Sequence, residues 1–178
     1  HSKLIHCLII TIAKNNNNDY WTSKIAYIVE KYNFHTGQLL WQRTQRYKEK
    51  TLFINIDGEN KEAITYNKFG NDLILASKAI DSLSDNNTIT VGILSFNQYK
   101  SALIDLCCLA FGIRIIPIPL NSTSDHLSYI LKEAEITHLF IGGDKSAQLW
   151  NSINKIHNIK IIDINNIGSI KGKTISWD

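Results

Sequence analysis

Blocks of apolar residues alternate with mixed blocks along the second half of the chain, from Thr88 to Ile164. The short blocks have the length and β-branched content of buried strands, and the longer ones repeat apolar residues at helical spacing. This order predicts strand, helix, strand, helix, strand, helix, strand. The predicted strands lie near Ile89–Leu94, Ile113–Pro119, Ile136–Ile141 and Ile159–Ile164. Strands alternating with helices form a parallel sheet covered on both faces. We therefore predict an α/β fold of three layers with a mostly parallel, doubly wound sheet.

The first half of the chain predicts peripheral elements. Apolar residues at helical spacing predict two amino-terminal helices, Tyr20–Tyr32 and Gln38 to about Tyr47. Two short β runs around Asp57-Gly58 predict a hairpin, and because their connection is longer than two residues we expect it to be bulged. A further helical stripe follows at Leu73, Ala76, Ile80 and Leu83. At the other end, Asn165–Asp178 has no clear period and is interpreted as an exit loop.

The helix predicted at Tyr99–Phe111 carries apolar side chains nearly all round, which is typical of a helix buried between other elements. Asp105 inside it must be hydrogen-bonded or face the polar side together with Ser101, and a structural role is the interpretation we favour. Cys107 and Cys108 also lie in this helix and are interpreted as buried, reduced thiols. The three cysteines and the histidines show no metal-ligand spacing, so no metal site is predicted.

Ligands of such a sheet bind at the carboxyl ends of its strands, here near Ser95–Asn97, Pro119–Ser122 and Gly142–Lys145. No catalytic set is present at these ends. Ser95 and Asn97 are interpreted as caps of the following helix, with ligand contact as the alternative. The segment Asn121–Asp125 offers several caps for the next helix, Ser122 with Asp125 among them. The glycines before Lys145 predict a turn, because their spacing does not fit a phosphate loop.

The composition is that of a globular domain. Apolar residues make up 44% of the 178 residues and the formal net charge is +3, which gives no electrostatic bias toward nucleic acid. Trp41, Tyr66 and Trp150 are interpreted as core or half-buried aromatic residues. The apolar run Leu4–Ala13 is about half as long as a membrane span requires, and a buried element is the interpretation we favour. The chain starts at His1 without Met, which indicates a start inside a longer or processed protein.

Three segments, in this order, resemble the opening of adenylate-forming enzymes, which include acyl-coenzyme A synthetases, luciferases and peptide-synthetase adenylation domains. Ile64–Phe69 is similar to their L-T-Y-x-E-L motif, although Phe69 stands where the motif often has Leu. Val91–Asn97 and Leu109–Leu120 resemble the following strand and the motif that ends in V-P-L. The resemblance covers roughly residues 39–164 and is strongest toward long-chain fatty acid–coenzyme A ligases. Asn121 stands where Pro or Asp is common, which weakens the assignment to one substrate group.

This resemblance implies an ATP-dependent ligase that forms an acyl-adenylate and passes the acyl group to a thiol. It implies ATP, Mg and coenzyme A as cofactors or co-substrates of the parent enzyme. It also implies that residues 38–178 are the first part of a large amino-terminal domain, after an extension at residues 1–37. The phosphate loop, the metal-binding Glu and the catalytic Lys of relatives have no counterpart here, so we expect this segment to be inactive alone and to have no catalytic residues. Its expected partners are the remainder of its own polypeptide and the small-molecule carboxylic acid, with no nucleic acid.

Four residues are candidates for the acyl or coenzyme A path: Ser95, Asn97, Asn121 and Lys145. The rival hypothesis is a non-catalytic α/β module that binds a partner protein or a small ligand. The apolar stretches at Leu4–Ala13 and Tyr20–Tyr32 lie outside the matched region and suggest a homodimer contact or a peripheral membrane contact. We expect a cytoplasmic protein, with peripheral membrane association as the alternative.

Overall fold

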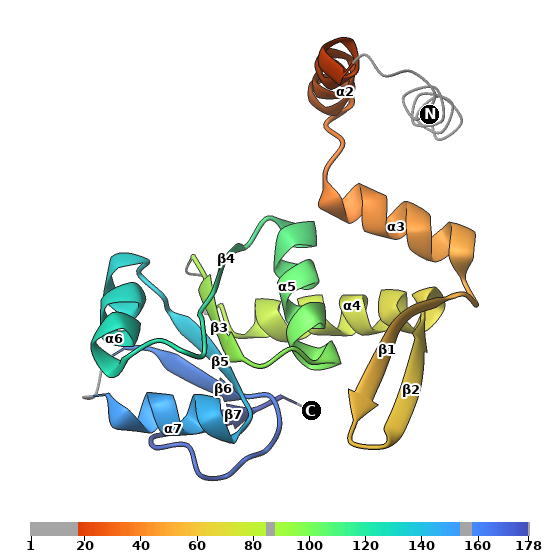
Figure 1. Ribbon diagram of the computed structural model, residues 1–178. Helices are drawn as coiled ribbons and strands as arrows, with labels where there is room; N and C mark the ends of the chain where they lie inside the picture. Colours follow the sequence, from red (N-terminus) through yellow and green to blue (C-terminus); the bar gives the residue numbers. More distant parts are fainter. Residues whose placement is uncertain (1–17, 85–87, 154–157, 178) are drawn as a thin grey trace.

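The computed structural model describes residues 18–84, 88–153 and 158–177. Its centre is a five-stranded sheet in the order β4, β3, β5, β6, β7, and every neighbouring pair runs parallel (Figure 1). The strands are β3 (Thr90–Ser95), β4 (Arg114–Pro117), β5 (His138–Gly142), β6 (Lys160–Asp163) and β7 (Thr174–Ser176). The predicted parallel sheet is confirmed, and Pro117, which has no N–H for a ladder bond, lies in an edge strand as expected.

Helices cover both faces of this sheet because its buried strands are apolar on both sides. The first hydrophobic core joins Val91, Phe140 and Ile162 to α4 (Tyr66–Ser82) and α5 (Tyr99–Phe111). The second joins Leu94, Leu139 and Ile161 to α6 (Ser124–Glu133) and α7 (Asp144–Ser152). The side chains on β3, β5 and β6 therefore alternate between two cores, and the predicted three-layer α/β architecture is confirmed.

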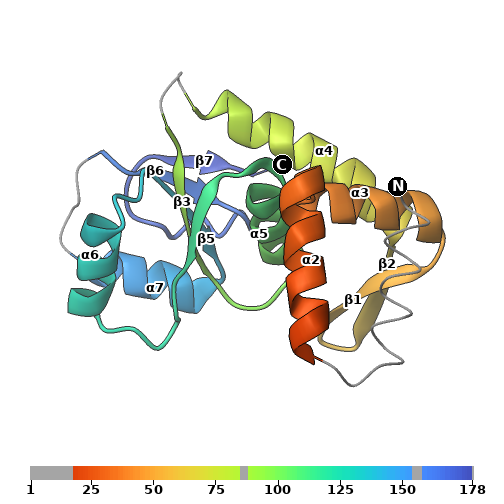
Figure 2. The same cartoon turned by 90° about the horizontal axis from the view of Figure 1, so that it is seen from above.

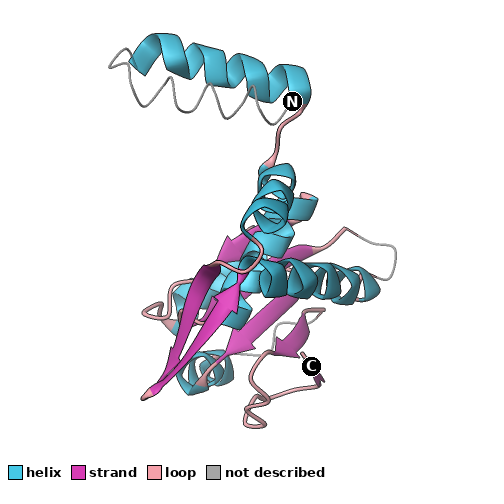
Figure 3. Cartoon of the chain, turned by 90° about the vertical axis from the view of Figure 1, so that its right-hand side faces the viewer, coloured by secondary structure: helices cyan, strands magenta, loops and turns pink. Residues whose placement is uncertain are grey.

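The peripheral hairpin and amino-terminal helices are also present. Strands β1 (Thr51–Asp57) and β2 (Asn60–Thr65) pair antiparallel, and the ring of Phe53 packs edge-on against Phe69 and Tyr99. Helix α3 (Thr36–Tyr47) lies against α4 and α5, as Figure 2 shows from above. Helix α2 (Asn18–Tyr32) stands away from the sheet and its covering helices (Figures 1 and 3). The apolar run Leu4–Ala13 lies outside the described residues.

Two predictions about loops are wrong. The hairpin turn holds only Gly58 and Glu59, because Asp57 still pairs with Asn60 and Gly58 adopts the left-handed φ of 59° that a tight turn requires. The register shift lies instead at the other end of the hairpin, between Thr51 and Phe53. The segment after Asn165 is not only an exit loop, since it supplies β7, the fifth strand of the sheet.

Helix α5 is not buried all round. Its inner face is covered by α3, α4 and the sheet, but the side chains of Leu109 and Phe111 are 47% and 56% exposed. The prediction for Trp41 is wrong, because its side chain is 60% exposed. The face of α3 that is turned inward carries Thr44, which is buried against Gly70 of α4. Trp150 is buried as predicted, and its indole N–H donates to the carbonyl oxygen of Lys171.

One of the two predicted helix caps is wrong. Gln98 is the N-cap of α5, and its backbone N–H donates to the hydroxyl of Ser101, so Ser95 and Asn97 do not cap this helix. The cap of α6 is Thr123, one of the residues in the predicted set Asn121–Asp125, and its hydroxyl accepts from the N–H of His126.

Candidate functional site

The strand order of the sheet has a switch point between β3 and β5, where successive connections lead to opposite edges of the sheet. From β3 it crosses to β4 on one side, whereas from β5 it crosses to β6 on the other. The crevice between the carboxyl ends of two such strands is the usual ligand position in a doubly wound sheet. Here it lies between Ser95 and Gly142, which are register partners at the ends of β3 and β5.

Side chains of the chain itself fill this crevice. The ring of Phe96 lies against Gly143, so closely that a Cβ at residue 143 would be 2.7 Å from the ring. Gln98 and Asn165 exchange two hydrogen bonds between their carboxamides, each 2.9 Å long, and the Gln98 amide also donates to Ser95 Oγ at 2.8 Å. These contacts tie the loop after β3 to the loop after β6. Two ligand-sized grooves lie beside these contacts.

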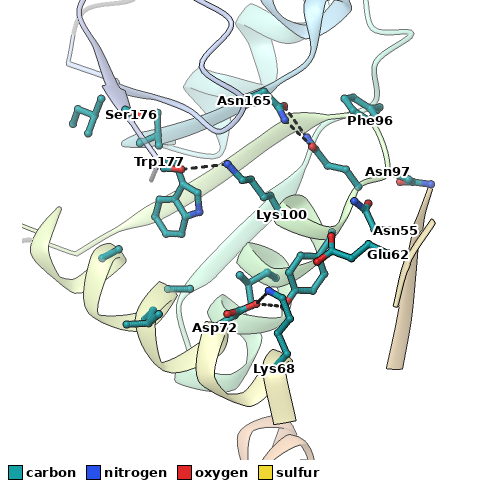
Figure 4. Close-up of a pocket in the computed structure, with 18 of the residues that line it drawn as sticks. Asn55, Glu62, Lys68, Asp72, Phe96, Asn97, Lys100, Asn165, Ser176 and Trp177 are labelled. Carbon is teal, nitrogen blue, oxygen red and sulfur yellow. Dashed lines mark hydrogen bonds and ion pairs between the residues drawn. The ribbon is translucent and has the colours of Figure 1, made fainter. Parts of the chain in front are cut away.

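One groove lies on the α4 side of this loop. We call it the hairpin groove; it has a volume of about 920 Å³ and is walled by the hairpin, α4, the loop after β3 and the ends of β6 and β7 (Figure 4). A second groove of about 970 Å³, the edge groove, lies between the hairpin, α5 and the loop after β4. Both volumes are in the range of small-molecule sites. The residues that line both grooves are Asn55, Ile56, Phe96, Asn97, Gln98 and Tyr99.

A polar cluster of Lys68, Asp72 and Tyr99 lies in the wall of the hairpin groove. Figure 4 shows its members Lys68 and Asp72 side by side. The phenol of Tyr99 donates to Asp72 Oδ2 at 2.6 Å, and Lys68 Nζ donates to the same oxygen at 2.8 Å. Burial, followed by the hydrogen bond to Asp72, raises the pKa of the Tyr99 phenol. Tyr99 therefore stays protonated and serves as a donor that joins α4 to α5.

The edge groove contains the carboxyl group of Asp105, which lines it together with Ser101. Asp105 thus faces the polar side of α5, one of the two arrangements expected for an acid in this helix. Burial raises the pKa of its carboxyl group above the ordinary value for Asp.

Two of the four predicted site residues lie at the grooves. Ser95 lines the edge groove and Asn97 lines both grooves. Asn121, in the turn before α6, and Lys145, in the first turn of α7, are exposed and line neither groove. The glycines before Lys145 form the predicted turn, with Gly143 as the N-cap of α7 at a φ of 87°.

Sequence reasoning missed the residues that shape the hairpin groove. Lys68 and Asp72 lie four residues apart on one helix, a spacing from which their ion pair could have been predicted. Tyr99 and Asn165 carried no such signal, because their partners Asp72 and Gln98 are 27 and 67 residues away along the chain. Within the described ranges, no group of three His, Cys, Asp or Glu side chains has a metal-binding arrangement.

The parallel sheet, the antiparallel hairpin and the helices on both faces resemble one part of the fold of solved adenylation domains and fatty acyl-CoA synthetases. Solved structures with this fold include the fatty acyl CoA synthetase of Mycobacterium tuberculosis, which is 15% identical with a TM-score of 0.63 over 80% of this chain and 26% of that one. The R395G form of coronafacic acid ligase from Pectobacterium brasiliense is 12% identical with a TM-score of 0.64, over 80% of this chain and 28% of that one. The fatty acyl-adenylate ligase of L. pneumophila, solved with acyl adenylate and pyrophosphate, is 15% identical with a TM-score of 0.59, over 80% and 26%.

The resemblance predicted from the sequence is thus confirmed at the level of fold: the structural neighbours are adenylation domains and fatty acyl-CoA synthetases. The chain spans about a quarter of the length of these neighbours. The amino-acid sequence matches no protein-family model and no curated protein sequence. Among the helices of the described residues, none has the length and apolar content needed to cross a bilayer.

Proposed function

We propose that this chain is the opening segment of an ATP-dependent, acyl-adenylate-forming ligase, of the type that joins a fatty acid to coenzyme A. The observation that carries the proposal is the likeness of the hairpin and parallel sheet to adenylate-forming ligases over 71–80% of the chain. The ordered motifs at Ile64–Phe69, Val91–Asn97 and Leu109–Leu120 support the same assignment from the sequence.

In this proposal residues 38–178 are the first part of the large amino-terminal domain and residues 1–37 are an extension. The parent enzyme uses a carboxylic acid, ATP with Mg, and coenzyme A, and the chain's main partner is the remainder of its own polypeptide. The groups that hold the phosphates and the metal are expected outside these 178 residues, so the segment has a scaffolding role and is inactive by itself. A homodimer contact or a peripheral membrane contact through Tyr20–Tyr32 in a cytoplasmic protein is part of the same proposal.

Ser95 and Asn97 are the residues we assign to one wall of the acyl or pantetheine path. Their position at the carboxyl end of β3, beside the grooves, supports this role. Asn121 and Lys145 are assigned a contact to coenzyme A, for which a lysine ammonium on an exposed helix turn is chemically suited. Asn121, in the turn before α6, and Lys145, in the first turn of α7, are both exposed, and we expect their substitution to affect coenzyme A binding alone.

The proposal is tested by pyrophosphate release with ATP, Mg²⁺ and a panel of carboxylic acids of increasing chain length. We expect none from the 178-residue chain, and acid-dependent release from a longer polypeptide whose reading frame continues past Asp178 into a Thr/Ser-Gly-Thr-Thr-Gly-like loop. Asn97→Ala in that polypeptide should raise KM for the acid or for coenzyme A, whereas Asn60→Ala at the hairpin, outside both grooves, should leave it unchanged.

The second candidate is a non-catalytic α/β module that binds a partner protein or a small ligand. The closed crevice between β3 and β5, filled by Phe96 and the Gln98–Asn165 pair, is the observation that favours it. A stop codon directly after Asp178, or a longer polypeptide that releases no pyrophosphate with any acid, would decide for the module and against the ligase.

A further inference from the structure

The edge groove has apolar walls that are open to water. Ile54 and Ile56 of β1 line it on the hairpin side and are 62% and 64% exposed, and Phe96 in the loop after β3 is exposed as well. Pro117 and Pro119 line it from the edge of the sheet, at the end of β4 and just after it. Covering such side chains removes apolar surface from water, which favours a ligand with an apolar body.

One carboxyl group interrupts this apolar lining. Asp105 lines the edge groove from α5, and it is the one charged side chain among the described residues that line this groove. The charged residues of the hairpin groove do not line the edge groove; they are Glu62, Lys68, Asp72 and Lys100. Within the described part of the chain, the Asp105 carboxyl group has neither a hydrogen bond nor an ion pair. The edge groove therefore offers apolar walls and one negatively charged acceptor.

The hydration of this carboxyl group decides which ligands the groove accepts. Burial already raises the pKa of the Asp105 carboxyl group, because the group has lost part of its water. A purely apolar chain laid along the groove would remove more of this water and supply no hydrogen bond in return. A chain that carries an O–H or N–H donor at this point would replace the lost water, whereas a carboxylate would be repelled.

The carboxylate of an acid in this groove therefore belongs at the end away from Asp105. Asn97 lines the groove at the carboxyl end of β3, just before α5 begins at Tyr99, and Asp105 lies six residues further along that helix. At 1.5 Å per residue, Tyr99 and Asp105 are about 9 Å apart along the helix axis. The side-chain amide of Asn97 can donate to a carboxylate, and within the described residues it has no hydrogen bond.

We propose that the edge groove binds the chain of a carboxylic acid that carries a hydrogen-bond donor, a hydroxyl or an ammonium group, at the end remote from its carboxylate. The carboxylate lies at Asn97, the apolar chain lies along the exposed isoleucines of β1, and the donor binds Asp105. This inference rests on the proposed function, because it names the class of acid that the ligase activates through the path assigned to Ser95 and Asn97.

The test is an NMR titration of the 178-residue chain with three probes that differ at one end: 8-hydroxyoctanoate, 8-aminooctanoate and octanoate. The titrations are made at pH 8, far above the ordinary pKa of an aspartate. We expect saturable shifts at the backbone amides of Asn97, Ala102, Asp105 and Ile118, with a dissociation constant for 8-hydroxyoctanoate on the order of a millimolar. The two donor-bearing probes should bind roughly two- to tenfold more tightly than octanoate, because each forms a charge-assisted hydrogen bond with Asp105.

Asp105→Leu should reverse this preference and make octanoate the tightest of the three probes. The leucine continues the apolar lining and leaves the hydroxyl or ammonium donor of the other probes without a partner. Asp81→Leu is the matched control, because it makes the same exchange at an exposed position of α4 that lies outside both grooves. This control variant should keep the preference of the wild-type chain.

Three results of the titrations would overturn the proposal: no saturable shifts at the groove residues, equal binding of the three probes, or the wild-type preference retained in Asp105→Leu. Pyrophosphate release tests the ligase separately. Release by the longer polypeptide with equal kcat/KM for octanoate and 8-hydroxyoctanoate would overturn this inference and leave the ligase in place. The expected titrations without pyrophosphate release from any acid would refute the ligase and keep the preference of the groove.

Discussion

At the scale of single residues, the Lys68–Asp72–Tyr99 cluster joins the starts of two helices that are remote in sequence. One carboxylate oxygen of Asp72 accepts from both the Tyr99 phenol and the Lys68 ammonium. The Lys68 ammonium also lies 5.4 Å from the centre of the Tyr99 ring. The cluster therefore fixes the position of Tyr99, against which the hairpin residue Phe53 packs.

Replacing Tyr99 by Phe keeps the ring and removes only the phenol donor. We expect the free energy of unfolding to fall by about 1 kcal/mol, the usual net value of such a hydrogen bond, measured by urea denaturation at pH 7. Tyr129→Phe is the control, because Tyr129 is 62% exposed. Equal stability of the Tyr99→Phe and Tyr129→Phe variants would show that the phenol contributes nothing.

The two thiols of α5 give a second prediction, on pH dependence. Burial raises the pKa of Cys107 to about 11 and, with smaller contributions from Cys107 and Asp105, that of Cys108 to about 12. In the unfolded chain both thiols lose their protons near pH 8.5. The folded state therefore holds these protons more tightly, and the resulting stability is complete below pH 8.5 and is lost as pH rises above it.

We expect the free energy of unfolding to fall between pH 8.5 and 10 by up to about 1.4 kcal/mol per pH unit for each buried thiol. Denaturant titrations at several pH values, with a reductant present, measure this slope. Cys108→Ala should make the slope shallower, whatever its effect on stability at pH 7. An unchanged slope in this variant would refute the assignment of the pH dependence to Cys108.

At the scale of elements, helix α3 is attached to the body of the protein through residues that lack bulk. Gly37 lies so close to α5 that an added Cβ would be 2.6 Å from the carbonyl oxygen of Ala110. A Cβ added at Gly70 of α4 would similarly lie 3.1 Å from the methyl carbon of Thr44 of α3. Close approach at these two glycines, together with the packing of Leu40 on the first core, attaches this helix.

Gly37→Ala tests this packing, because its effect on helix propensity raises the stability of the fold whereas its effect on tertiary packing lowers it. Helix propensity alone would stabilise the chain by up to about 1 kcal/mol, whereas the clash with the Ala110 carbonyl should destabilise it by roughly 1–3 kcal/mol. Gln45→Ala, at an exposed position of the same helix, controls for propensity. A Gly37→Ala variant that is more stable than wild type in thermal unfolding would contradict the close approach.

At the scale of the whole molecule, the last described residue, Trp177, packs against the first core. Trp177 follows β7, its backbone N–H donates to the carbonyl oxygen of Asp163, and its indole packs edge-on against Phe140 at 5.2 Å between ring centres. Phe140 lies on β5 in the middle of the sheet. The segment after Asn165 thus closes one face of the fold instead of leaving it.

Trp177→Ala should therefore lower the free energy of unfolding by about 2 kcal/mol, less than for a fully buried aromatic residue because the indole is only half-buried. Trp41→Ala is the control and should change it by no more than about 0.5 kcal/mol, since Trp41 is 60% exposed. Equal effects of the two substitutions in denaturant unfolding would mean that the Trp177 segment is not part of the cooperative core.

The sequence by itself determined the layered fold of this protein. Strands such as Val91–Leu94 and helical stripes such as Leu73, Ala76 and Ile80 follow from local period, because a buried strand or helix face must be apolar wherever it lies. The order of these elements was enough to predict a parallel sheet, and the motifs at Ile64–Phe69, Val91–Asn97 and Leu109–Leu120 carried the resemblance to adenylate-forming enzymes; the structure confirms the sheet and the likeness of fold.

Tertiary structure alone decided where space remains and which polar groups face it. The Gln98–Asn165 and Tyr99–Asp72 pairs join residues distant in sequence, and such pairings have no period that a single chain reveals. The same holds for β7, whose three residues are too few to show a pattern until β6 supplies their hydrogen bonds. The local sequence pattern determines the helices and strands. The closed crevice and the open grooves depend instead on how closely those helices and strands approach one another.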